Sequence, residues 1–385
     1  MVDVIIAGTG QTEVGEHWDI SLRQLAFETI DQAINDAAGL QPQAMFVGNM
    51  LAPQLSRQAH VGALLADYAH LNGIEAASIE AGGASGGAAL RAGTMAVASG
   101  IVDVALVVGV EKITDTIGGE VETALATSGD SDYEAIHGLT LTAQAALLMR
   151  RYMYEYDVPR DCFAGFAINA HANGTGNPKA MFRKAISAET YQKAGVVSDP
   201  LNIFDVAPNA DGAAALVLAR ADILPAKSPA PRVRIAASSL ATDTLALHDR
   251  PNPLVFTAAR LTVERACEKA RITPLQIDFF ELFDAYSIFA ALSLEAAGFA
   301  APGEGWKLAQ NGYISISGSL PISTMGGLKA RGNPVGATGV YQAVEAALQL
   351  QGRAGKNQIS DVHRGMIQSL GGPASTAVTH ILEVI

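Results

Sequence analysis

Residues 79–115 read IEAGGASGGAALRAGTMAVASGIVDVALVVGVEKITD, and this stretch decides the fold. A predicted strand over Ala77–Ala81 runs into the glycine-rich turn GGASGG at 82–87. Small residues then predict a helix over Ala88–Ser99, and a continuous apolar run predicts a buried strand over Val104–Val110. This succession is typical of a βαβ unit whose helices cover a largely buried sheet.

The second half of the chain repeats this order of elements. The sequence GNPVGATG at 332–339 precedes a predicted helix over Val340–Leu350, as the turn at 82–87 precedes its own helix. Upstream, each half carries a helix, an aliphatic-x-Pro step and a strand; the two strands are predicted at Met45–Val47 and Ile277–Leu282. We therefore predict an α/β protein made of two duplicated βαβ-type halves, stacked with helices between and outside them.

The region between the halves has a different composition. Residues 116–205 are rich in Tyr, Arg and Lys and predict an inserted subdomain of helices and loops. Residues 1–115 with 206–224 are predicted to form the N-terminal half, and 232–385 the C-terminal half. The segment Pro225–Pro231 is the predicted linker between them.

The start of the chain offers a possible cofactor motif that we reject. An apolar run over Val2–Ala7 predicts a strand, and GTG at 8–10 predicts a tight turn. A dinucleotide fingerprint requires a third small residue where Glu13 stands. The next element is a predicted amphipathic helix, with Ser21 or Asp19 as its N-cap.

Composition excludes several classes of protein. Of the 385 residues, 49% are hydrophobic and only 17% charged, which excludes a disordered chain. The net charge of −12 argues against nucleic acid or an anionic membrane as a main partner. The two cysteines form no zinc-ligand pattern, the scattered histidines predict no metal site, and no apolar run suits a signal peptide or membrane helix. A cytoplasmic protein is expected.

The sequence resembles the thiolase superfamily, most closely the sterol-carrier-protein-type thiolases and the archaeal acetyl-CoA acetyltransferases. Besides 79–115, the resemblance is carried by HANGTGNPKAMF (171–182), DGAAALVLA (211–219), ELFDAYSIFAALSLEAAGF (281–299), KARGNPVGATG (329–339) and QSLGGPAST (368–376). It implies the thiolase fold, an αβαβα sandwich with an inserted loop domain that holds coenzyme A. It also implies a homodimer or homotetramer.

The residues that perform thiolase chemistry are substituted. The family motif E-A-A-C-A-S-G-G places its nucleophilic cysteine where this chain has Gly83. The two family histidines correspond to Phe283 and Asn333, and the cysteine base of many relatives corresponds to Ser369. An acyl-enzyme requires a nucleophile such as a thiolate, and Cys162 and Cys267 are predicted to be packing residues. These substitutions argue against cysteine-dependent thiolysis.

Several polar groups remain as candidates in the same motifs. Asn333 is expected either to donate a hydrogen bond to a developing oxyanion or to cap its own loop. Asp284 is either a base or a buried structural carboxylate, and Tyr286 and Ser369 are candidate hydrogen-bond donors. The basic residues Lys179, Arg183 and Lys184 are expected either to contact the phosphates of coenzyme A or to form a solvated face.

The functional hypothesis is a protein of the acetyl-CoA acetyltransferase family that binds a coenzyme A thioester and acts on the adjacent carbon–carbon bond. No covalently bound cofactor is expected. One alternative is a non-catalytic subunit beside a small OB-fold, zinc-ribbon partner of the kind that archaeal relatives have. Another is an aldol-type lyase on a β-hydroxyacyl-CoA. The motif GASGG at 83–87 also matches the serine-hydrolase elbow, but Ser85 is explained as a small residue in a tight turn.

Overall fold

The computed structural model describes residues 2–116, 118–225 and 230–385. Within them, nine strands form one hydrogen-bonded sheet in the order β3-β2-β4-β7-β1-β8-β11-β10-β9. The N-terminal strands are β1 (Val4–Gln11), β2 (Ala44–Gly48), β3 (Glu75–Ile79), β4 (Val104–Glu111) and β7 (Gly212–Arg220). The C-terminal strands are β8 (Val233–Thr242), β9 (Phe279–Glu281), β10 (Arg364–Gly371) and β11 (Thr376–Val384).

Two half-sheets meet at a narrow seam. Strands β1 and β8 pair through only two residues of β1, Ile5 and Ile6. Each half has the same pairing scheme. Its first strand at the seam pairs antiparallel with its last strand (β1 with β7, β8 with β11), and it also contains a parallel pair (β2 with β4, β9 with β10). An isolated parallel bridge between Phe280 and Ile322 takes the place that β3 has beside β2. The repeated order of elements in the sequence thus appears as a repeated strand topology.

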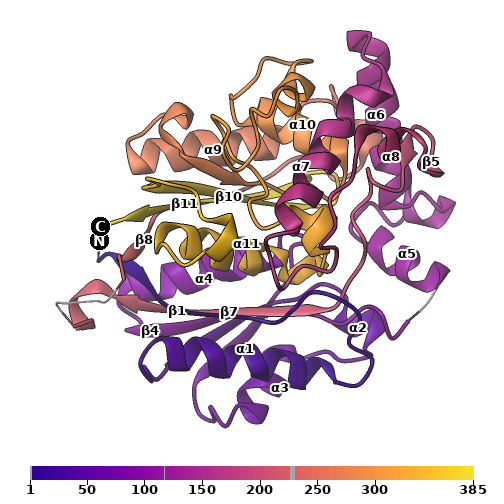
Figure 1. Cartoon of the computed structure of the whole chain (residues 1–385). Helices are drawn as coiled ribbons and strands as arrows, with labels where there is room; N and C mark the ends of the chain where they lie inside the picture. The colour runs from indigo at the N-terminus through magenta and orange to yellow at the C-terminus, as the bar shows by residue number, and fades with distance from the viewer. Residues whose placement is uncertain (1, 117, 226–229) are drawn as a thin grey trace.

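Helices complete a five-layered sandwich (Figure 1). The middle layer holds α4 (Ser85–Ser99) and α11 (Thr338–Leu350), which pack between the half-sheets. The outer layers hold α1 (Leu22–Asp36) and α3 (Val61–Tyr68) on one face, and α9 (Thr257–Ala270) and α10 (Ser287–Ala296) on the other. The predicted α/β architecture, with helices between and outside two stacked halves, is confirmed.

The segment between β4 and β7 is largely helical and lies beside one end of the sandwich (Figure 1). It contains α5 (Gly119–Ala126), α6 (Leu141–Tyr156), α7 (Ala164–Gly174), α8 (Ala188–Gln192) and the short strands β5 (Val196–Ser198) and β6 (Leu201–Asn202). The short helix α2 (Ala52–Leu55) follows β2. Residues 226–229 of the predicted linker lie outside the described residues, and the domain boundaries stay predictions.

Helix α1 forms as its sequence predicts. Ser21 is the N-cap, and its side chain and that of Gln24 make the reciprocal contacts of a capping box. The apolar positions, Leu25, Ile30 and Ala33 among them, are buried against the sheet. The helix therefore begins where a local capping signal meets an apolar stripe.

The predicted turn at residues 8–10 is wrong. Strand β1 continues through Gly8 and Gly10 to Gln11. A β-carbon on Gly8 would collide with the backbone of Ala33, and one on Gly10 with the carbonyl oxygen of Thr29. These glycines allow α1 to approach the strand closely, a use of glycine that sequence alone does not distinguish from a turn.

The middle helix α11 is buried on nearly all sides, including its polar residues. Glu345 pairs with Arg331 at 3.1 Å, with both side chains about 1% exposed, and the Arg331 guanidinium lies 4.9 Å from the centre of the Tyr341 ring. Gln342 donates to the carbonyl oxygens of Glu281, Leu282 and Gln368. A helix that is buried on every side needs such internal partners for its polar groups. No helix in the described ranges is both long and apolar enough to span a bilayer.

Candidate functional site

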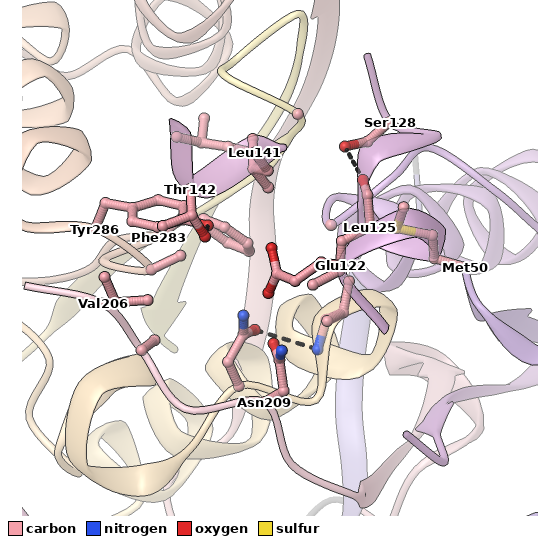
Figure 2. A pocket seen from close by; sticks show the side chains of 17 residues that line it. Met50, Glu122, Leu125, Ser128, Leu141, Thr142, Val206, Asn209, Phe283 and Tyr286 are labelled. Carbon is pink, nitrogen blue, oxygen red and sulfur yellow. Dashed lines mark hydrogen bonds between the residues drawn. The ribbon is translucent and has the colours of Figure 1, made fainter. Parts of the chain in front are cut away.

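A small cavity lies where the N-terminal ends of α4 and α11 come together under the insert (Figure 2). Its volume of about 40 Å³ has room for roughly three water molecules. It is lined by Met50, Gly83, Glu122, Leu125, Ser128, Leu141, Thr142, Val206, Ala207, Asn209, Phe283, Ala285, Tyr286, Asn333, Val335, Leu370 and Gly372. Both halves of the sandwich and helices α5 and α6 of the insert therefore contribute to one site.

Four of the predicted positions come together here. Gly83, Phe283, Tyr286 and Asn333 all line the cavity although they are up to 250 residues apart in sequence. Backbone contacts hold them in place: Ala207 N–H donates to the Ala285 carbonyl at 2.8 Å, and Asn333 N–H donates to the Pro208 carbonyl at 3.0 Å. The segment after β6 thus ties the loop before α10 to the loop before α11.

Gly83 has no room for a side chain. A β-carbon at this position would lie 2.8 Å from Cζ of Phe283 and 2.7 Å from the carbonyl oxygen of Leu370. Such distances are too short for ordinary carbon contacts, so a side chain here requires its neighbours to move. The Phe283 ring therefore fills the space next to the position that carries the nucleophile in the thiolase motif.

The turn before α4 is stabilised by its own polar atoms. The Ser85 hydroxyl donates to the Gly82 carbonyl at 2.6 Å and accepts from Ala81 N–H at 2.9 Å. Gly82 adopts φ +59°, a conformation that glycine tolerates best. Ser85 is fully buried, so its hydroxyl serves the turn and is not presented as a nucleophile.

Asn333 caps its own loop, and its role as a hydrogen-bond donor to an oxyanion stays a prediction. Its Oδ1 accepts hydrogen bonds from Val335 N–H and from the Thr338 hydroxyl, each at 3.2 Å, so it caps the start of α11. Because Oδ1 already accepts these two hydrogen bonds, the NH₂ group of Asn333 is left to donate a hydrogen bond to a ligand in the cavity. Asn209, which pairs with it through a backbone bridge, supplies a second amide to the lining.

A buried carboxylate anchors the Asn333 loop from behind. Glu111, at the end of β4, accepts hydrogen bonds from the N–H groups of Met50, Leu51 and Gly336 and from the Asn49 side chain. Burial raises the pKa of Glu111 to about 7, against the opposing effect of these donors. Glu111 thus connects β4, the segment before α2 and the loop before α11 beneath the cavity.

Four polar residues of the lining were missed from the sequence. Glu122 on α5, Ser128 just after α5 and Thr142 on α6 come from the insert, and Asn209 precedes β7. Figure 2 shows Glu122 extending into the cavity between Asn209 and the pair Thr142–Tyr286. The Thr142 and Tyr286 hydroxyls are hydrogen-bonded at 3.0 Å. Burial raises the pKa of Glu122, partly offset by a hydrogen bond from Thr142, and burial also raises the pKa of Tyr286.

Asp284 and Ser369 have their side chains engaged elsewhere and are not part of the described lining. The Asp284 carboxylate accepts from Ser323 Oγ at 3.1 Å and Leu328 N–H at 2.7 Å, and burial raises its pKa. The Ser369 hydroxyl donates to Oε1 of Gln342 at 2.9 Å. Their proposed catalytic roles stay predictions, and the contacts that each makes are those of buried structural groups.

The three basic residues of the insert also lie outside the described lining. The half-buried Lys179 amine donates to the Gln11 carbonyl, so it binds the insert to β1. Arg183 and Lys184 are exposed, and Arg183 donates to the Pro178 carbonyl at 3.0 Å. Their contact with coenzyme A phosphates stays a prediction.

Neither cysteine belongs to the lining. Cys162 is half-buried beside α7, Cys267 is buried on α9, and burial raises the pKa of both thiols. A raised pKa keeps a thiol protonated and unreactive at neutral pH. In the described part of the chain, no group of three or more His, Cys, Asp or Glu side chains is arranged to hold a metal ion.

The layers and the position of the cavity define the class: an α/β protein of the thiolase type. The chain belongs to the thiolase family, because residues 4–222 match the model "Thiolase, N-terminal domain" and residues 239–384 match "Thiolase C-terminal domain-like". It is 41% identical over 385 residues to an acetyl-CoA acetyltransferase of Methanothermobacter thermautotrophicus, with all of both chains covered. The predicted superfamily is confirmed.

The chain is also similar to a second relative and to a solved structure. The chain is 30% identical to benzoylsuccinyl-CoA thiolase subunit BbsB of Thauera aromatica, covering 96% of this chain and 94% of the relative. A solved structure, the Ltp2-ChsH2(DUF35) aldolase, superposes with a TM-score of 0.85 at 24% identity, covering 99% of this chain and 98% of that chain. This last likeness shows the fold.

Proposed function

We propose that this chain binds a coenzyme A thioester in the cavity at Gly83 and makes or breaks the carbon–carbon bond next to the thioester without forming an acyl-enzyme. One observation carries the proposal: the position of the family nucleophile is a glycine whose β-carbon space is occupied by Phe283. The cavity is nevertheless lined by an amide, a carboxylate and a phenol. Such groups can transfer protons and stabilise an enolate, but they cannot replace a thiolate as an acyl carrier.

The best-supported reaction is an aldol-type one. In the cleavage direction, a β-hydroxyacyl-CoA loses its hydroxyl proton, the bond between its α and β carbons breaks, and the α carbon takes up a proton to give acetyl-CoA and a carbonyl compound. No external oxidant, reductant or acyl carrier is needed. The small cavity volume favours a short acyl group.

A non-catalytic role beside a partner protein is the second candidate. The small size of the cavity favours this role. Its volume of about 40 Å³ holds roughly three water molecules, which leaves little space for two reacting groups. The name of the Thauera relative describes a subunit, and the name of the similar solved structure joins two proteins. These names support a partner such as the predicted OB-fold protein. A cytoplasmic homodimer or homotetramer stays part of the proposal.

Three measurements on the purified protein test these functions. Calorimetry with acetyl-CoA is expected to show binding, and no binding would overturn the proposal. Incubation with acetoacetyl-CoA and coenzyme A is expected to leave the enolate absorbance unchanged, and rapid loss would contradict the absence of an acyl-enzyme route. Release of acetaldehyde from 3-hydroxybutyryl-CoA would support the lyase. Binding without cleavage, either alone or with a co-purified partner, would favour the subunit.

A further inference from the structure

The insert brings a single carboxylate into the cavity. Among the described lining residues, Glu122 and Tyr286 are the only groups that titrate. Glu122 lies on α5, its side chain is half-buried, and Figure 2 shows it extending into the cavity. A carboxylate that is partly buried without a Lys or Arg partner does not stabilise the fold. Such a group at the wall of a small cavity is a candidate for proton transfer.

The neighbours of Glu122 form a path for a proton. The Thr142 hydroxyl lies 3.0 Å from the Tyr286 hydroxyl, lines the same cavity as Glu122, and lowers the pKa of that carboxyl. The chain Glu122–Thr142–Tyr286 therefore joins a carboxylate to a phenol through a hydroxyl that can both donate and accept. Its two ends lie on the same cavity, so a proton taken up at one end can be replaced at the other.

We propose that Glu122 removes and returns the proton on the α carbon of the bound acyl group; this inference rests on the proposed function. In the condensation direction, the carboxylate takes a proton from the α carbon, and the electron pair of that C–H bond moves to give a thioester enolate. The NH₂ group of Asn333 donates to the enolate oxygen. The α carbon then bonds to the carbonyl carbon of a short aldehyde or ketone, and Tyr286 gives a proton to the resulting alkoxide.

The proton count then balances within the site. The phenolate regains its proton from Glu122 through Thr142, which leaves all three residues in their starting state. Cleavage of a β-hydroxyacyl-CoA follows the same steps in reverse. The role of Tyr286 also requires its proton to stay on at neutral pH, and burial raises the pKa of Tyr286 in agreement with that.

Deuterium exchange into acetyl-CoA tests the first step without any second substrate. The wild-type chain in D₂O is expected to exchange the methyl protons of acetyl-CoA, followed by mass spectrometry. Glu122→Gln is expected to slow this exchange by roughly 10²–10⁴-fold, the usual contribution of a general base. Glu122→Asp is expected to keep part of the rate, and Glu120→Gln, on the exposed side of the same helix, is expected to match the wild type.

Calorimetry with acetyl-CoA on each variant separates the possible outcomes. If Glu122→Gln binds as the wild type does and loses exchange, the inference stands. If the wild type binds and exchanges but Glu122→Gln exchanges within about threefold of it, Glu122 is not the base, while the proposed function survives. If the wild type binds without exchange, this inference is overturned. If the wild type does not bind acetyl-CoA, the proposed function itself is overturned.

Discussion

The Phe283 ring lies against the backbone of Gly83, with Cζ only 2.8 Å from the point where a β-carbon of residue 83 would be. The identities of residues 83 and 283 are therefore sterically coupled. The phenyl ring takes space that a side chain at position 83 would need. A side chain introduced at position 83 alone is therefore expected to clash with the Phe283 ring.

The first prediction concerns this contact. Gly83→Ala is expected to lower the free energy of unfolding by about 1–3 kcal/mol, because the new methyl group overpacks against Phe283 and the Leu370 carbonyl. Urea denaturation followed by circular dichroism measures the change. Gly119→Ala is the control, since a β-carbon at Gly119 would meet nothing within 4 Å. Equal stability of Gly83→Ala and the wild type would show that the contact is loose.

The second prediction concerns the carboxylate that anchors the start of the insert. Asp211 accepts from the Lys112 amine at 2.9 Å and from Ile113 N–H at 2.6 Å, and its side chain is fully buried. Asp211→Asn is expected to cost about 3–5 kcal/mol of unfolding free energy, because it leaves the buried Lys112 charge without its buried partner. Thermal and chemical denaturation measure this loss.

Asp115→Asn provides the matched control, since Asp115 also pairs with Lys112 but is about half exposed. Its cost is expected to stay below about 1 kcal/mol. If the two variants lost the same stability, the buried position of Asp211 would not be the source of its contribution.

The third prediction concerns pH. Burial raises the pKa of Glu281 to about 8, with the nearby Glu345 adding to the shift. The group is protonated in the folded chain and ionised after unfolding, so the free energy of unfolding falls as pH rises from about 4.5 toward 8. Between pH 7 and 8, Glu281 is expected to contribute a slope of up to about 1.4 kcal/mol per pH unit.

Glu281→Gln is expected to flatten that slope, as measured by urea denaturation at several pH values. Glu111 and Glu345, with pKa values raised to about 7 by burial, act in the same direction mainly below this window. His380 acts in the opposite direction at lower pH, because burial lowers its pKa to about 4. An unchanged slope in Glu281→Gln would mean that Glu281 is ionised in the folded chain.

The fourth prediction concerns the exposed basic residues of the insert. The double variant Arg183→Ala, Lys184→Ala is expected to weaken acetyl-CoA binding about tenfold at low salt, which corresponds to about 1.4 kcal/mol, because two charges near the phosphates are lost. Lys193→Ala, another exposed lysine of the insert, is the control. S-acetyl-N-acetylcysteamine is a short thioester that lacks the phosphates. Calorimetry is expected to show that the double variant and the wild type bind it with the same affinity. Equal weakening for that short thioester would rule out phosphate contact.

Local patterns were sufficient to predict most of the elements. The apolar run at Val104–Val110 became the buried strand β4, and the small-residue helix after the glycine-rich turn became α4, starting three residues earlier at Ser85. The failure at Gly8 and Gly10 has a physical cause. A glycine that lets a helix pack closely against a strand looks the same in sequence as a glycine in a turn. Only the packing of α1 against β1 distinguishes the two.

The candidate site was predicted less completely than the fold. Gly83, Phe283, Tyr286 and Asn333 were found because each lies in a recognisable motif. Glu122 was missed because it stands two residues from Glu120 in a helix that carries no recognisable motif. The available signal was the helical periodicity of 119–126, which places Glu122 on the side of the buried Val121 and Leu125.

The sequence alone determined that this chain is a two-half α/β protein of the thiolase family and that position 83 carries no thiol, because periodicity, turn residues and motifs are local properties. The tertiary structure decided which polar groups meet in the cavity. The Asp284 carboxylate accepts a hydrogen bond from Ser323, whereas Glu122 of the insert lines the same cavity as Tyr286 of the C-terminal half. These two pairs of residues are 39 and 164 positions apart in sequence. Their arrangement depends on how whole elements pack, and no short segment of sequence encodes it.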